Sequence, residues 1–197
     1  MTDLTGALRR RWAIANASRG EPAATQGDAA PVPAAVRATR DRRNRAARGW
    51  AFGLLVALLV QFGIGMYVNL FATIPLNHPG HAASDFFAGS YHSVAWAETS
   101  PHAPVILAFH AGLGLLLVVA SIWLAVLAIR GRRAGIMWAA VLGALFILAA
   151  GFNGASFLSY NHDANSYVMA LLFAAAVLCY AVILALAGDT ERQAPAA

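Results

Sequence analysis

Four long apolar segments limit what this chain can fold into. They cover residues 50–74, 105–129, 136–159 and 167–187, and none of them contains Arg, Lys, Asp or Glu. Each is near or above the roughly 20 residues that an α-helix needs to cross the hydrocarbon core of a bilayer. Backbone groups in lipid must be satisfied within the segment, so we expect helices. The sequence therefore predicts an all-α integral membrane protein, an antiparallel four-helix bundle over residues 49–188.

The composition agrees with this class. Only 12% of the residues are charged, whereas a soluble domain carries about 25%. All 14 basic residues are arginines, and ten of them fall in residues 1–48. That segment is rich in Ala, Arg and Pro without apolar periodicity, so we expect a disordered basic tail. A short amphipathic turn on anionic lipid is the alternative for residues 4–14. Nucleic acid is not expected as a partner, because the tail has few aromatic residues and no fold.

The placement of arginine predicts the orientation. Four arginines closely precede the first apolar segment and three lie in the connection 130–133, whereas the connections 75–104 and 160–166 contain none. Arginine-rich connections stay on the cytoplasmic side. We therefore expect the tails 1–48 and 189–197 in the cytoplasm and the loop 75–104 outside. The absence of lysine beside abundant alanine indicates a GC-rich bacterial genome, and hence a bacterial cytoplasmic membrane.

All six histidines fall on the outward side of this topology. Four of them belong to the loop 75–104: His78, His81, His92 and His102. His162 lies in the connection 160–166, and only His110 lies inside an apolar segment. Polar groups in lipid are costly and usually face the interior of a bundle. The histidines therefore point to a site in the outer half.

Polar residues at similar depth predict a pocket there. His110 lies about 9 Å below the start of its helix, and Asn153 lies about 10 Å from the end of its own. Ser156 shares a helical face with Asn153. The first apolar segment carries a polar stripe formed by Gln61, Gly65, Asn69 and Thr73. We predict a pocket built from Asn69, His110, Asn153 and Ser156, with His162 and Asp163 near its mouth.

Two further patterns concern packing. Residues 83–98 are expected to form a short interfacial helix with aromatic anchors, which would cap the pocket. Small residues at four-residue spacing, as in Ala139 and Gly143 or in Ala150 and Gly154, allow helices to approach closely in lipid. Both patterns favour one compact bundle.

A haem site is the first functional interpretation. The segment PVILAFHAGLGLLL around His110 resembles helices of membrane b-type cytochromes and of the halves of haem A synthase. Imidazole is a standard axial ligand of haem iron, so the resemblance implies haem b with His110 as a ligand. A second ligand would have to be His162, His78 or His92. Covalent attachment is excluded, because no CxxCH motif is present.

Two other interpretations remain. The histidines His78, His81, His92 and His102 could hold a Cu or Zn ion, since imidazole suits both metals. Cys179 is the only cysteine, so a cysteine-based metal site is excluded. Alternatively, His110 and Asn153 only fix helix packing, and the chain is an accessory subunit of a larger membrane complex.

The segments GMYVNLFATIPLNHPG and GFNGASFLSYNHDANSYVMAL resemble a family of uncharacterised four-helix integral membrane proteins of GC-rich bacteria. The resemblance covers residues 50–187 and leaves out the basic tail. It implies the same four-crossing topology and carries no activity.

Overall fold

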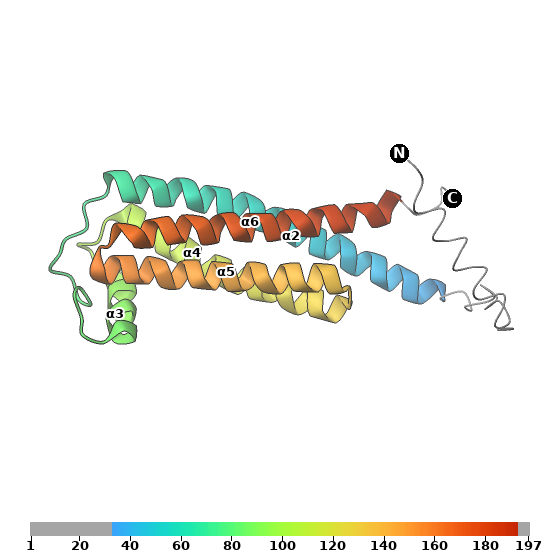
Figure 1. Ribbon diagram of the computed structural model, residues 1–197, viewed down its shortest axis with the longest axis horizontal. Helices are drawn as coiled ribbons and strands as arrows, with labels where there is room; N and C mark the ends of the chain where they lie inside the picture. Colours follow the sequence, from blue (N-terminus) through green and yellow to red (C-terminus); the bar gives the residue numbers. More distant parts are fainter. Residues whose placement is uncertain (1–32, 193–197) are drawn as a thin grey trace, which may run out of the picture. The chain divides into compact units, whose positions relative to one another are not determined.

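A computed structural model describes residues 33–192, and the chain divides into two compact units, residues 1–37 and 38–197. The second unit contains all of the described residues except 33–37. The described residues form five helices and no strand (Figure 1): α2 (Ala34–Phe71), α3 (Phe86–Thr99), α4 (Val105–Gly131), α5 (Ala134–Tyr160) and α6 (Asp163–Arg192). The prediction of an all-α chain is confirmed over this range.

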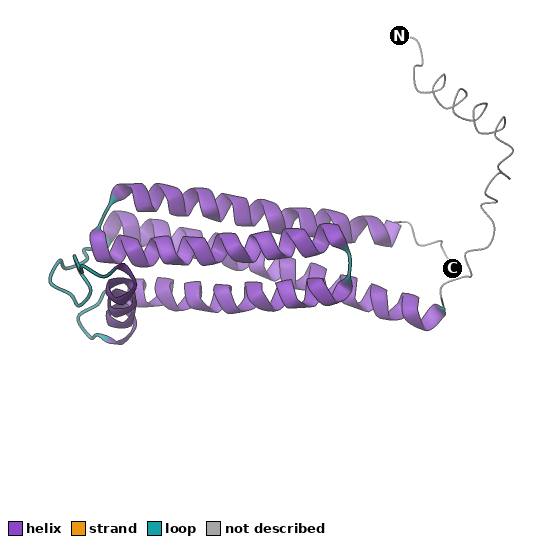
Figure 2. Cartoon of the chain, turned by 60° about the horizontal axis from the view of Figure 1, so that its bottom comes forward, coloured by secondary structure: helices purple, strands orange, loops and turns teal. Residues whose placement is uncertain are grey.

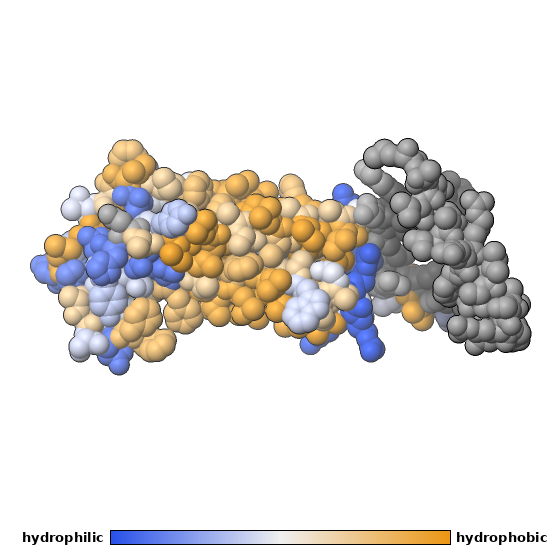
Figure 3. All heavy atoms as spheres, in the orientation of Figure 1, coloured by the Kyte–Doolittle hydropathy of each residue, from blue (hydrophilic) through white to orange (hydrophobic). Residues whose placement is uncertain are grey.

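Four of these helices are long and apolar enough to cross a membrane: Arg42–Phe71, Val105–Gly131, Ala134–Tyr160 and Ala164–Gly188. Large hydrophobic side chains are exposed on all four, among them Phe52, Val119, Leu145 and Leu178. Figure 3 shows them as an apolar surface along the helices, with hydrophilic residues gathered beyond it. A water-soluble protein rarely exposes so much contiguous apolar area, so these helices indicate a multi-pass membrane protein.

Helix α2 begins much earlier than residue 50, where the sequence predicted its start. Residues 34–48, expected to be disordered, are helical, so that part of the prediction is wrong. Ala and Arg are strong helix formers, and an apolar segment that is already helical continues into them without a break. Pro33 precedes the helix, and its carbonyl accepts a hydrogen bond from the Val36 amide (2.9 Å). The rest of the predicted basic tail, including residues 4–14, lies outside the described residues, as does 193–197.

The remaining helices lie close to the predicted segments. Helix α3 confirms the short helix expected over residues 83–98. Helix α4 is capped by Arg132 (φ 57°) and helix α5 by Asn161 (φ 52°), both in the left-handed conformation that often terminates helices. Helix α6 begins at Asp163, before the predicted start at Tyr167, because the first hydrogen bond already joins the Asn165 amide to the His162 carbonyl (2.9 Å).

The main core lies between the long helices, which Figure 2 shows side by side. Tyr180 and Ile183 of α6 and Leu124 of α4 are fully buried in it. Rings of Phe62 and Phe173 stack at 4.8 Å and join α2 to α6. Small residues make room along α5, where an added Cβ at Gly143 would lie 2.9 Å from the Tyr180 ring.

A second, smaller core lies at one end of the helices. It contains Val68, Ala97, Leu107 and Leu158, which come from α2, α3, α4 and α5. Helix α3 therefore packs across this end (Figures 1 and 2). We call it the histidine-rich end, comprising residues 72–104 and 161–162. The opposite, arginine-rich end comprises residues 42–48 and 130–133, which are joined by a hydrogen bond from Arg43 Nη1 to the Arg130 carbonyl (3.2 Å).

Candidate functional site

The connection between α2 and α3 is hydrogen-bonded to the end of α5. The Ala82 amide donates to the Ser159 carbonyl (2.8 Å), and the Tyr160 hydroxyl donates to the Ala83 carbonyl (3.0 Å). Within α3, the buried Ser93 hydroxyl lies 3.1 Å from the Ser159 hydroxyl. Gly80, with φ +90°, allows the turn to approach α3 closely. These contacts hold the connection and α3 against the end of α5.

His78 is buried in the same connection. Its ring stacks on Trp96 of α3, with centroids 4.5 Å apart. Nδ1 lies 2.9 Å from the Pro79 carbonyl oxygen, and Nε2 lies 3.1 Å from the Leu158 carbonyl oxygen. Both ring nitrogens therefore face backbone acceptors, so neither is directed at a ligand.

Beneath α3 lies a cavity of about 510 Å³. All five described helices contribute to its lining, which is mostly apolar. Its polar lining residues are Gln61, Asn69, Ser90, His110 and Ser166. A largely apolar cavity with a few convergent polar groups is the usual form of a small-molecule site.

His110 and Gln61 form the polar centre of this cavity. The Gln61 side-chain amide donates to the His110 carbonyl (2.9 Å), and its nitrogen lies 3.5 Å from His110 Nε2. His110 Nδ1 and Gln61 Oε1 are buried and have no hydrogen-bond partner in the described part of the chain. An unsatisfied buried polar group costs about 1–3 kcal/mol. Both atoms therefore carry this cost within the packed helices.

Two glycines make room for this pair. An added Cβ at Gly65 of α2 would lie 2.7 Å from His110 Cε1, and one at Gly114 of α4 would lie 3.2 Å from Gln61 Nε2. The imidazole ring therefore lies against the backbone of α2 and points into the bundle, away from lipid. Gly65 belongs to the polar stripe that the sequence analysis identified.

The structure brings some of the predicted pocket residues together and separates others. Asn69 and His110 both line the cavity, whereas Asn153 and Ser156 do not. The Asn69 side-chain oxygen accepts from the Ser166 hydroxyl (3.1 Å), and the Ser156 hydroxyl accepts from the Asn165 side-chain amide (3.1 Å). These bonds join α2 and α5 to α6.

His162, predicted near the mouth of the pocket, does not line the cavity. His162 is exposed in the turn before α6, with its ring parallel to that of Tyr160 and 6.4 Å away. Asp163 is the first residue of α6. The pocket predicted from the sequence did not include Gln61, Ser90 or Ser166. The polar stripe on the first apolar segment already contained Gln61, but nothing in the pattern of Ser90 or Ser166 distinguishes them from ordinary helix residues.

The four loop histidines do not converge on one point. The rings of His78 and His81 are 5.6 Å apart, edge to face, while the ring of His92 packs on that of Tyr91. His102 is exposed after α3. Over residues 33–192, no three or more His, Cys, Asp or Glu side chains are grouped so that they could hold a metal ion. The Cu or Zn interpretation therefore has no ligand set in this range.

The cavity also limits how haem could be held. Of the histidines in the described range, His110 alone lines it, and the candidate second ligands His78, His92 and His162 do not. Two thioethers do line it, those of Met66 and Met169. Haem iron is commonly held by His alone or by His and Met. The lining therefore offers one of the predicted histidine ligands, His110, and lacks the second histidine that a bis-histidine haem would need.

Comparison with protein families, with curated proteins and with solved structures gives no match for this chain. The resemblance to uncharacterised four-helix membrane proteins therefore stays a prediction.

Proposed function

We propose that this chain is a multi-pass protein of the bacterial cytoplasmic membrane, an antiparallel four-helix bundle with both termini in the cytoplasm. The apolar surfaces of the four long helices support insertion. The arginine-rich end supports the orientation, because arginine-rich connections stay in the cytoplasm. The histidine-rich end would then face outward.

Cysteine labelling tests this orientation. In a Cys179→Ala background, Ser84→Cys and Arg132→Cys place one thiol at each end, at exposed positions. A membrane-impermeant maleimide added to intact cells should label Ser84→Cys, and should label Arg132→Cys only after the cells are opened. The reverse pattern would refute the orientation, and recovery of the protein in the soluble fraction would refute insertion.

We propose further that the cavity holds a mostly apolar ligand that presents a polar or metal-bearing group to His110. The observation that carries this proposal is the pair of buried atoms without a partner, His110 Nδ1 and Gln61 Oε1. A ligand group that contacts them would offset their desolvation, while the apolar lining would bind the rest of the ligand.

Haem b is the specific candidate within this class. Imidazole is a standard ligand of haem iron, and the mostly apolar lining suits a porphyrin. His110 would bind the iron, Met66 or Met169 could supply a second ligand, and α3 would exclude water from above. Bound haem would supply one-electron chemistry, as expected of a subunit in a redox or respiratory assembly.

The first experiment is a visible absorption spectrum of the purified protein, oxidised and then dithionite-reduced, with organic extraction of the same sample. A Soret band that is lost in His110→Ala and kept in His102→Ala would support haem b. An extracted apolar compound without a Soret band, again lost in His110→Ala, would support another ligand of the same class. If neither is found after expression with added haem precursor, the cavity proposal is wrong.

A structural role as an accessory subunit is the second candidate. The bonds between Asn69 and Ser166 and between Ser156 and Asn165 favour it, since they join helices and are not directed at a ligand. Such bonds are worth about 0.6 kcal/mol on average and chiefly specify geometry. Under this hypothesis, Phe87 and Tyr91, which are exposed on α3, would contact another subunit. Cross-linking from photoreactive residues at these positions would identify that partner, and cross-links to lipid only would contradict it.

A further inference from the structure

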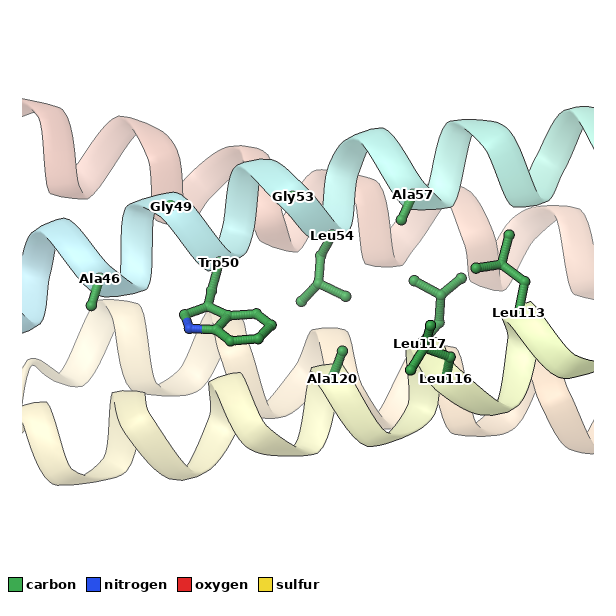
Figure 4. Close-up of a pocket in the computed structure, with 10 residues that line it drawn as sticks. All are labelled: Ala46, Gly49, Trp50, Gly53, Leu54, Ala57, Leu113, Leu116, Leu117 and Ala120. Carbon is green, nitrogen blue, oxygen red and sulfur yellow. The ribbon is translucent and has the colours of Figure 1, made fainter.

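A second hollow lies between α2 and α4, in the half of the bundle nearer the arginine-rich end. It has a volume of about 430 Å³ and we call it the α2–α4 groove. Its lining consists of Ala46, Gly49, Trp50, Gly53, Leu54, Ala57, Leu113, Leu116, Leu117 and Ala120. Figure 4 shows the Trp50 ring and the Leu54 side chain in the space between the two helices. Small residues of α2 leave this space open, because an added Cβ at Gly49 or Gly53 would meet nothing within 4 Å.

The groove has the length of a single lipid chain within one leaflet. Residues 46–57 of α2 span about 16 Å at 1.5 Å per residue. Half of a bilayer's hydrocarbon core is about 15 Å thick. Trp50 stands near the start of the groove, where tryptophan commonly marks the membrane interface.

The face of α2 that lines the groove carries arginines where it extends toward the arginine-rich end. Arg42 and Arg45 precede Ala46 and Gly49 by four residues each, and residues four apart share a helix face. Both arginines are exposed, and residues 42–48 contain four arginines and no acidic residue. The bond from Arg43 to the Arg130 carbonyl holds the end of α4 beside this part of α2.

We propose that the α2–α4 groove binds an anionic phospholipid of the cytoplasmic leaflet, with one acyl chain in the groove and the phosphate at Arg42 and Arg45. Basic pockets between membrane helices on the cytoplasmic side are suited to anionic headgroups. A second copy of the chain is disfavoured as the occupant, since it would bring another arginine cluster against the first. The proposal rests on membrane insertion in the proposed orientation, and not on the ligand of the cavity under α3.

Native mass spectrometry of the full-length protein tests it, using an equimolar mixture of phosphatidylglycerol and phosphatidylcholine with identical acyl chains. We expect one phosphatidylglycerol to be retained in preference to phosphatidylcholine. The double variant Arg42→Gln, Arg45→Gln should lower that preference roughly fivefold for each arginine removed. The control Arg132→Gln changes the residue that follows α4, outside the lining face of α2, and should lower it much less.

Filling the groove tests the acyl-chain site. Gly53→Leu and Gly49→Leu should each abolish retention of the lipid, whereas Gly63→Leu should not. Gly63 is a matched control, since a Cβ there also meets nothing within 4 Å and it lies outside the groove on the same helix. Equal retention of both lipids, or full retention in both groove variants, would overturn the proposal. The proposal would also be overturned if the wild-type protein were a dimer and Gly53→Leu made it a monomer without loss of lipid. A second copy of the chain would then be the occupant of the groove.

Discussion

The contact between Gly143 of α5 and Tyr180 of α6 gives the sharpest test of the helix packing. A Cβ added at Gly143 would lie 2.9 Å from Tyr180 Cε1 and Cζ and 3.0 Å from its hydroxyl oxygen. Tyr180 is 0% exposed and packed on every side, so its ring has nowhere to move. Gly143→Ala should therefore force the two helices apart.

The magnitude follows from two opposing terms. Overpacking a well-filled core costs about 1–3 kcal/mol, while replacing glycine by alanine within a helix gains about 0.5–1 kcal/mol. Gly151→Ala is the matched control on the same helix, because its Cβ would meet nothing within 4 Å. The difference between the two variants removes the helix term, so Gly143→Ala should be less stable than Gly151→Ala by about 1–3 kcal/mol.

Reversible unfolding in mixed micelles, followed by far-UV circular dichroism, measures both free energies. The steric origin is tested in a Tyr180→Leu background, where the ring atoms closest to the new methyl group are absent and the cost of Gly143→Ala should fall. Equal stability of Gly143→Ala and Gly151→Ala would refute the reasoning. An undiminished cost in the Tyr180→Leu background would also refute it.

Three further outcomes are expected at the histidine-rich end and in the cavity beneath α3. Gly80→Ala should destabilise the connection before α3 by about 1–3 kcal/mol, because φ is +90° there and the new Cβ would collide with the Gly89 carbonyl oxygen. The control Gly131→Ala should not destabilise this connection, because its Cβ would lie in open space. Limited proteolysis of the connection measures the difference between the two variants. Gly65→Ala should displace the His110 ring and weaken ligand retention by the cavity, as measured by the spectrum or by extraction, and equal retention would show that the ring position does not matter. Ser93→Ala should cost about 1 kcal/mol in unfolding free energy by removing the bond to Ser159, and an unchanged unfolding midpoint would contradict this.

The long helices were predictable because the physics that forms them is local. An apolar segment of sufficient length without charges becomes helical in lipid whatever it contacts, and α4 and α5 lie within a few residues of their predicted bounds. The error at the start of α2 has a local cause too. The prediction of disorder rests on the lack of apolar periodicity in residues 34–48, although their helix propensity is high and a neighbouring helix is present to extend.

The candidate site was only partly predictable, because depth along a helix does not fix direction around it. Asn153 lies at a depth similar to that of His110, yet it does not line the cavity. Helix rotation is set by which side chains interlock with the neighbouring helices. Gly65 and Gly114 decide that His110 faces α2 and meets Gln61, and neither contact can be deduced from spacing along one segment.

The sequence by itself determined that four helices can cross a bilayer, that arginines gather in the N-terminal tail and in the connection 130–133, and that five of the six histidines fall in the other two connections. These properties depend on composition and on order along the chain. Only the tertiary structure decided that His78 has both ring nitrogens against carbonyl groups, whereas His110 has one nitrogen without a partner in a cavity. The chemical character of a histidine depends on groups from distant segments, and these are brought to it only when the helices pack.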